Sequence, residues 1–160
     1  MQDALIGGWS RQPSFSAEML APLHDLNLKF LNLAGAHAGG WRTSGPLGLP
    51  GGVSERLVPM SASQRAAAAN CPYALFDLRF HDEAHWSTRL RGEGEWRVAD
   101  GGAEQDTANF VRLALFYAWH VANTTRHAAQ LLLGMSERTA GAFRATMLNC
   151  LPTQIGRAHV

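Results

Sequence analysis

The amino-acid sequence predicts a mainly α-helical protein. Apolar residues recur at the three- and four-residue spacing of a helix in two long stretches, near residues 22–38 and 107–122. Segments rich in glycine and proline separate the periodic stretches, which favours several helices joined by loops. The chain has 160 residues, of which 46% are hydrophobic and 17% charged, so it can bury a core of single-domain size.

The first helix is predicted to begin at Pro22, because proline fits a first turn, where its missing N–H costs no hydrogen bond. Residues 1–20 contain Gly, Pro and Ser and are expected to be an irregular lead-in. The helix should end at residues 38–40, before a loop rich in glycine and proline. Its apolar face consists of Leu23, Leu26, Phe30, Leu31 and Ala34.

Shorter elements are expected in the middle of the chain. A short helix is predicted over residues 53–58, and a second over 64–69, which Ser61 or Ser63 can cap. Alternating side chains predict a short strand over 73–82, and residues 86–98 are interpreted as a β-hairpin that turns at the glycines 92 and 94. Residues 83–105 are therefore expected to be a linker or hairpin between two helical parts.

The last third of the chain gives the clearest pattern. After the helix near 107–122, Asn123 and Thr124 mark a break, and a second helix is predicted over 126–133. Gly134 is placed for a left-handed turn, Met135 is expected to be buried, and Ser136 is expected to cap a helix over 137–146. A last short helix is predicted to begin after residue 149.

Residues 128–144 have the form helix, glycine, apolar residue, serine, helix, which is typical of a helix-turn-helix. If this corner binds DNA, Arg138 and Arg144 on its second helix are the best candidates for contacts with phosphate or bases. Glu137 on the same helix and Arg126 on the first are further candidates. The alternative is an ordinary corner between two helices, which small helical domains often contain.

A weak internal repeat accompanies this corner. Leu47-Gly48-Leu49 precedes Leu133-Gly134-Met135 by 86 positions, and Leu57 precedes Phe143 by the same number. An apolar helix comes before each of these Leu-Gly turns, and a further helix comes after it. Two such copies would pack against each other as a pseudo-dimer, in which each buries the apolar surface of the other.

These segments resemble the family of the flagellar transcriptional activator FlhD. The matching pieces are LHDLNLKFLNLA, LGL, VSERL, the helix at 64–69 and ALFDLRFHD, of which Leu26-Asn27-Leu28 and Arg79-Phe80 are the most specific. A second match runs over residues 109–160, with Ala118, Leu133-Gly134-Met135 and Phe143 in register.

The resemblance implies two FlhD-like helical repeats in tandem, residues 21–82 and 106–160, that form a pseudo-dimer within one chain. It also implies a transcription activator of the flagellar type, a subunit that assembles with itself or with an FlhC-like partner to bind DNA. Two alternatives stay open. One is a protein-interaction module of the same fold without DNA binding, and the other is a ligand sensor with a single C-terminal helix-turn-helix.

The charge distribution favours a protein that contributes to nucleic-acid binding over one that binds nucleic acid alone. Fourteen basic and thirteen acidic residues leave a net charge of +1. Residues 1–105 hold nine Lys/Arg and eleven Asp/Glu, whereas residues 106–160 hold five and two. The C-terminal third is therefore mildly basic, in contrast to the strongly basic profile of proteins that hold DNA by their own field.

Other classes of protein are not indicated. The chain has two cysteines and no CxxC pair, no apolar run long enough for a membrane span, and no signal-like N-terminus, which predicts a cytoplasmic protein. His81 and His85 are spaced for zinc on a helix, but a solvated polar turn is the preferred interpretation. Since no group of residues suited to acid–base catalysis is evident, we expect that the protein is not an enzyme and that it binds no cofactor and no metal.

Overall fold

The computed structural model describes residues 15–36, 53, 56–91, 102–147 and 151. Within these ranges it contains six helices of eight or more residues and no β-strand, so the expected mainly α-helical class is confirmed. The helices are α1 (Ala17–Ala36), α3 (Ala62–Ala69), α4 (Glu83–Leu90), α5 (Gly102–Thr124), α6 (Arg126–Leu133) and α7 (Glu137–Ala145).

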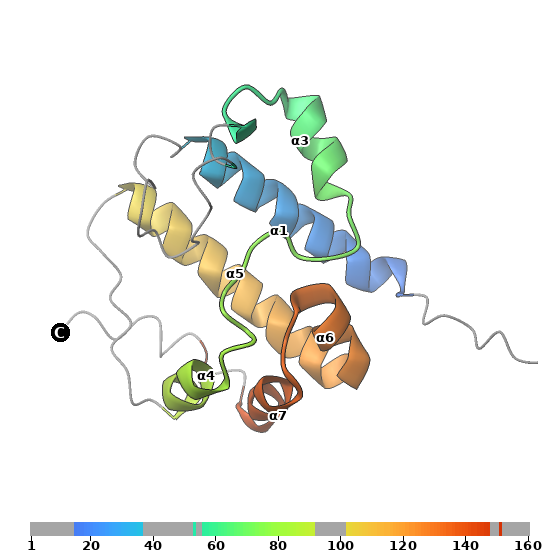
Figure 1. Ribbon diagram of the computed structural model, residues 1–160, viewed down its shortest axis with the longest axis vertical. Helices are drawn as coiled ribbons and strands as arrows, with labels where there is room; N and C mark the ends of the chain where they lie inside the picture. The colour runs from blue at the N-terminus through green and yellow to red at the C-terminus, as the bar shows by residue number, and fades with distance from the viewer. Residues whose placement is uncertain (1–14, 37–52, 54–55, 92–101, 148–150, 152–160) are drawn as a thin grey trace, which may run out of the picture.

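The two long helices, α1 and α5, lie side by side and form the centre of the molecule (Figure 1). Helix α3 packs against α1, whereas α6 and α7 pack against α5 and against each other. Helix α4 lies against α7. One apolar core runs through this arrangement, and its largest fully buried side chains include Trp86, Phe30, Phe80 and Phe143.

Helix α1 begins earlier than the sequence predicts. Its first residue is Ala17, so Pro22 lies inside the helix and not in its first turn. Proline there cannot donate to the carbonyl four residues before it, which loosens the turn. Burial of Met19 in the core compensates for this, and the Tyr117 hydroxyl of α5 donates a 2.9 Å hydrogen bond to the Met19 carbonyl. A contact from the other long helix therefore supports the added turn.

Local capping determines where α3 begins. The Ser61 hydroxyl accepts a hydrogen bond from the Gln64 N–H at 3.2 Å, and the Gln64 side chain accepts one from the Ser61 N–H at 2.8 Å. This reciprocal pair is a capping box, which satisfies two N–H groups that the first turn leaves without a partner. The expected helix over 64–69 is thus confirmed, with Ser61 as its cap. Val53, Arg56 and Leu57 are helical, as expected for residues 53–58.

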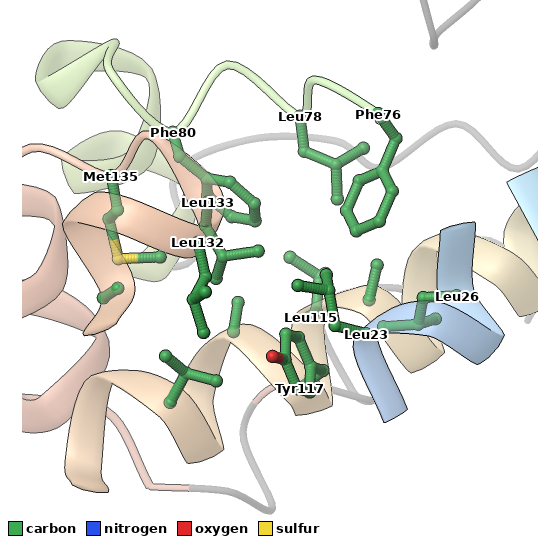
Figure 2. Packing of buried hydrophobic residues seen from close by; sticks show 14 of the residues in the cluster. Leu23, Leu26, Phe76, Leu78, Phe80, Leu115, Tyr117, Leu132, Leu133 and Met135 are labelled. Atoms are coloured by element: carbon green, nitrogen blue, oxygen red, sulfur yellow. The ribbon is translucent and has the colours of Figure 1, made fainter. Parts of the chain in front are cut away.

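The strand predicted over residues 73–82 is wrong. The alternation is present, because Phe76, Leu78 and Phe80 are buried while Asp77 and Arg79 are exposed. However, no neighbouring strand pairs with this segment in the part of the chain that the structure describes. It is a single non-helical segment, residues 74–80, which we call the extended segment; it bends at residues 75–76, and Arg79 in it is left-handed with φ 59°. The segment crosses α1 and α5 on its way from α3 to α4 (Figure 1). Figure 2 shows Phe76, Leu78 and Phe80 pointing toward Leu115 and Leu132.

The hairpin predicted over residues 86–98 is also wrong in its first arm, which is helical in α4. Asp82 caps this helix, since its carboxylate accepts a 2.9 Å hydrogen bond from the His85 N–H. Glu83 then places an acidic side chain in the first turn, where the helix dipole favours it. Residues 92–98 lie outside the described ranges.

The remaining expectations concern the linker, the last helix, the loop after α1 and a membrane span. Helix α5 begins at Gly102, within the segment expected to be a linker. Leu151 is helical and buried, but the other residues of the expected last helix lie outside the described part of the chain, as do residues 38–52. None of the helices in the described ranges combines the length and the apolar character needed to span a bilayer.

Candidate functional site

The corner between α6 and α7 has the geometry that the sequence predicts. Gly134 adopts φ 62° and ψ 23°, a left-handed conformation that favours glycine. The Gly134 N–H donates to the Gln130 carbonyl at 3.1 Å, and the Met135 N–H donates to the Ala129 carbonyl at 3.2 Å. Three residues, 134–136, separate the two helices, and helix-turn-helix motifs use a turn of about three or four residues.

The second helix of the corner is anchored at its first turn. The Ser136 hydroxyl accepts a 3.1 Å hydrogen bond from the Thr139 N–H, so Ser136 is the N-cap of α7 as expected. Met135 is buried between the helices and lies near Leu132 and Leu133 in Figure 2. Thr139, Ala140 and Phe143 form the buried face of α7. The opposite face of α7 is therefore the one available to a ligand.

The segment that holds this corner in place is not evident from the sequence pattern. The Ala74 N–H donates a 2.7 Å hydrogen bond to the Leu132 carbonyl at the end of α6. The Ser136 N–H donates a 3.3 Å hydrogen bond to the Phe80 carbonyl at the start of α7. The extended segment 74–80 thus joins both sides of the turn. In the sequence, only the alternation of apolar and polar residues over 73–82 indicates that this segment lies on the core.

Asn27 of α1 fixes the beginning of that extended segment. The Asn27 side chain is fully buried and donates hydrogen bonds to the Tyr73 carbonyl at 2.9 Å and the Ala69 carbonyl at 3.3 Å. Its oxygen accepts a 2.9 Å hydrogen bond from the Leu75 N–H. A buried amide is stable in a core only when both its donors and its acceptor are satisfied, as here. Asn27 therefore connects the first long helix to the corner.

An aromatic cluster attaches α4 to the inner face of α7. The Trp86 ring stacks on Phe80 with centroids 5.4 Å apart and packs on Phe143 at 5.0 Å. The Trp86 indole N–H donates to the carbonyls of Leu78 and Arg79, at 3.2 and 3.1 Å. Helix α4 is consequently held both by the extended segment and by α7, although the sequence predicted a hairpin there.

The four residues predicted to contact DNA do not form one cluster in the structure. Glu137 and Arg138 occupy the first turn of α7, and the Arg138 side chain is 86% exposed. Arg144 is half-buried, and its guanidinium lies 3.8 Å from the position that a Cβ on Gly141 would occupy. It thus folds back along α7 toward its beginning. Arg126 is the first residue of α6, at the opposite end of that helix from the turn.

An acidic side chain accompanies Arg138. Glu83, the first residue of α4, lies with a carboxylate oxygen 3.5 Å from the Arg138 Nη1. Nearby, a hydrogen bond from the His85 N–H lowers the pKa of Asp82, and the adjacent Arg79 guanidinium lowers it further. Burial lowers the pKa of His85 below its ordinary value, so its imidazole is neutral at pH 7. The charge beside the corner at pH 7 therefore comes from Arg and carboxylate groups.

The histidine pair considered for zinc has other surroundings. His81 is exposed, while His85 lies in α4, where its ring packs edge-on against Trp86 with centroids 5.4 Å apart. The carboxylate between them, Asp82, serves as the helix cap. No group of three or more potential metal ligands occurs among residues that the structure describes.

Comparisons with models of protein families, with curated proteins and with solved structures found no match to this chain. The residues and their geometry therefore provide the grounds for a function.

The turn glycine provides a test of this geometry. Replacing Gly134 with alanine is expected to destabilise the protein by about 1–2 kcal/mol, because an L side chain is strained at positive φ. The matched control is Gly141→Ala in the middle of α7, where φ is helical and the nearest atom is the end of a flexible arginine. That change should stabilise by about 0.5–1 kcal/mol. Urea unfolding measures both, and equal effects at the two positions would contradict the left-handed turn.

Proposed function

We propose that the α6–α7 corner is a helix-turn-helix that binds duplex DNA along the outer face of α7. The observation that most supports this is the combination of a left-handed Gly134 turn with a capped second helix whose first turn exposes Arg138. In such motifs the beginning of the second helix enters the major groove. Helix α5 would serve as the scaffold, since it packs against both helices of the corner.

We further propose that the protein is a transcription-regulator subunit of FlhD-like type, which acts with itself or with an FlhC-like partner. The burial pattern of the long helices supports an internal repeat, because a shift of 87 residues relates five of the seven buried positions in α1 to buried positions in α5. This shift is one residue larger than the 86 that relates the two Leu-Gly turns. The related pairs are Leu23 with Phe110, Asn27 with Ala114, Phe30 with Tyr117, Leu31 with Ala118, and Ala34 with Val121.

The two arginines of α7 have different expected roles. Arg138 projects into solvent at the beginning of the helix, where it can reach a base edge or a phosphate. Arg144 lies along the helix surface over Gly141 and is better placed for the sugar–phosphate backbone. Glu137 is exposed on the same turn as Arg138, so its negative charge reduces the positive electrostatic potential of this face. A partner protein would then supply additional affinity.

The test is binding to a random-sequence duplex over a salt series, alone and with an FlhC-like partner. We expect the double variant Arg138→Ala/Arg144→Ala to lose about tenfold or more in affinity and to reduce the salt slope by about two, one for each lost phosphate contact. The control is Lys29→Ala/Arg56→Ala, which removes two exposed cations from the first half of the chain. Fluorescence anisotropy measures both.

Two results would overturn the proposal. One is the absence of wild-type binding below about 100 μM at low salt, with and without the partner, since non-specific binders typically reach that level. The other is an equal loss of affinity in the two double variants, because that result would assign binding to net charge alone.

A protein-interaction module is the second candidate, and exposed apolar side chains favour it. Leu131 on α6 is 58% exposed and Met147 after α7 is 71% exposed. Large apolar side chains exposed to solvent are the kind of group that protein-binding surfaces use. If DNA binding fails, replacing both residues with serine should weaken self-association in analytical ultracentrifugation, and an unchanged association would count against this candidate.

A further inference from the structure

We infer that Glu83 of α4 weakens DNA binding at the proposed face by competing with phosphate for Arg138. This inference rests on the proposed function of the corner and adds a regulation of the same site. The contact joins two elements far apart in the chain, since 55 positions separate Glu83 from Arg138. The distance between the Glu83 carboxylate oxygen and the Arg138 Nη1 is 3.5 Å.

The position of Glu83 is determined by a well-anchored helix. Helix α4 begins at the Asp82 cap, and three residues after Glu83 the buried Trp86 packs on Phe143 of α7. At the same end, the Ser136 N–H donates to the Phe80 carbonyl, so the starts of α4 and α7 are fixed beside each other. Figure 1 shows these two helices as neighbours. The Glu83 carboxylate is therefore held beside the proposed DNA-binding face by a packed helix.

The exposure of the two side chains determines what this contact can do. The Arg138 side chain is 86% exposed and that of Glu83 is 42% exposed, so water screens the pair and it adds little to stability. A phosphate approaching Arg138 meets a second negative charge only a few ångströms from the guanidinium. It must compete for the cation and also overcome repulsion from the carboxylate. Glu83 therefore lowers affinity for duplex DNA in general, most strongly at low salt.

The test compares Glu83→Gln with wild type in binding to a random-sequence duplex, between about 50 and 200 mM salt. We expect the variant to bind about three- to tenfold more tightly at the low end, with the gain shrinking as salt screens the charges. The charge-matched control is Asp106→Asn near the beginning of α5, which removes an exposed carboxylate from another helix. That variant should bind like wild type.

A double-mutant cycle distinguishes a specific contact from a change in net charge. In an Arg138→Ala background, Glu83→Gln should gain clearly less affinity than in wild type, because its partner is absent. Equal affinities of wild type and Glu83→Gln, with binding still dependent on Arg138, would overturn this inference and leave the proposed function standing. Equal gains for Glu83→Gln and Asp106→Asn would also overturn it. If no variant binds the duplex at any salt, both proposals fail.

Discussion

Replacing Trp86 with alanine is expected to lower the free energy of unfolding by about 3–5 kcal/mol, the range for truncating a large buried aromatic side chain. Trp86 is almost completely buried between Phe80 of the extended segment and Phe143 of α7. Its removal leaves a cavity among these rings and deprives the Leu78 and Arg79 carbonyls of their indole donor. Helix α4 then loses its main attachment to the rest of the protein.

Urea unfolding measures this loss, and Trp86→Phe is the matched variant. Phenylalanine preserves most of the ring packing but not the indole N–H, so we expect it to cost about 1–3 kcal/mol, the penalty for an unsatisfied buried carbonyl. Hydrogen exchange should become faster across residues 83–90 in the alanine variant. A loss below about 1 kcal/mol for Trp86→Ala would contradict the packing of α4 on α7, since that is the range of surface substitutions.

Replacing Asn27 with alanine is expected to cost about 2–4 kcal/mol, because each buried polar group left without a partner costs about 1–3 kcal/mol. The Asn27 side chain serves the Tyr73 and Ala69 carbonyls and the Leu75 N–H together. Alanine removes all of these bonds at once, together with a 3.5 Å contact from the Asn27 amide to the Cys71 Sγ. The extended segment should then loosen from α1, and the corner should lose part of its support.

The matched control for this change is Asn32→Ala, which removes another asparagine from the same helix. Asn32 is exposed, and its side-chain oxygen accepts a hydrogen bond from Arg65 at 3.1 Å. We expect this control to change stability by less than about 1 kcal/mol. Faster exchange of the Ala74 and Ser136 amides in Asn27→Ala would confirm that Asn27 supports the corner. Similar stability losses at positions 27 and 32 would contradict the buried network.

The corner itself could be predicted from the sequence in detail. The bounds of α6, the left-handed Gly134, the buried Met135 and the Ser136 cap all agree with the pattern in residues 126–137. These features depend on interactions within about one helical turn, such as a cap hydrogen bond three residues along or a glycine at positive φ. A sequence pattern contains that information directly.

The middle of the chain could not be predicted in the same way. The alternating residues 73–82 have the burial of a strand, but a strand also needs a neighbour for its backbone hydrogen bonds, and period-two burial does not say whether one exists. The segment bonds instead to Asn27, Leu132 and Ser136. Similarly, Trp86 of α4 is buried against Phe143 of α7, a partner that no spacing within residues 83–90 specifies.

The helical class, the apolar faces of the helices and the α6–α7 turn follow from residues a few positions apart, so they can be predicted from local patterns. Which groups contact the corner depends on the tertiary fold. Asn27 bonds to the end of α3, 42 positions later in the chain, and Glu83 lies beside an arginine 55 positions away. Such partners depend on how the whole core packs, and no local spacing specifies them. For this reason the sequence predicts Arg138 as a candidate DNA contact but does not predict Glu83 beside it.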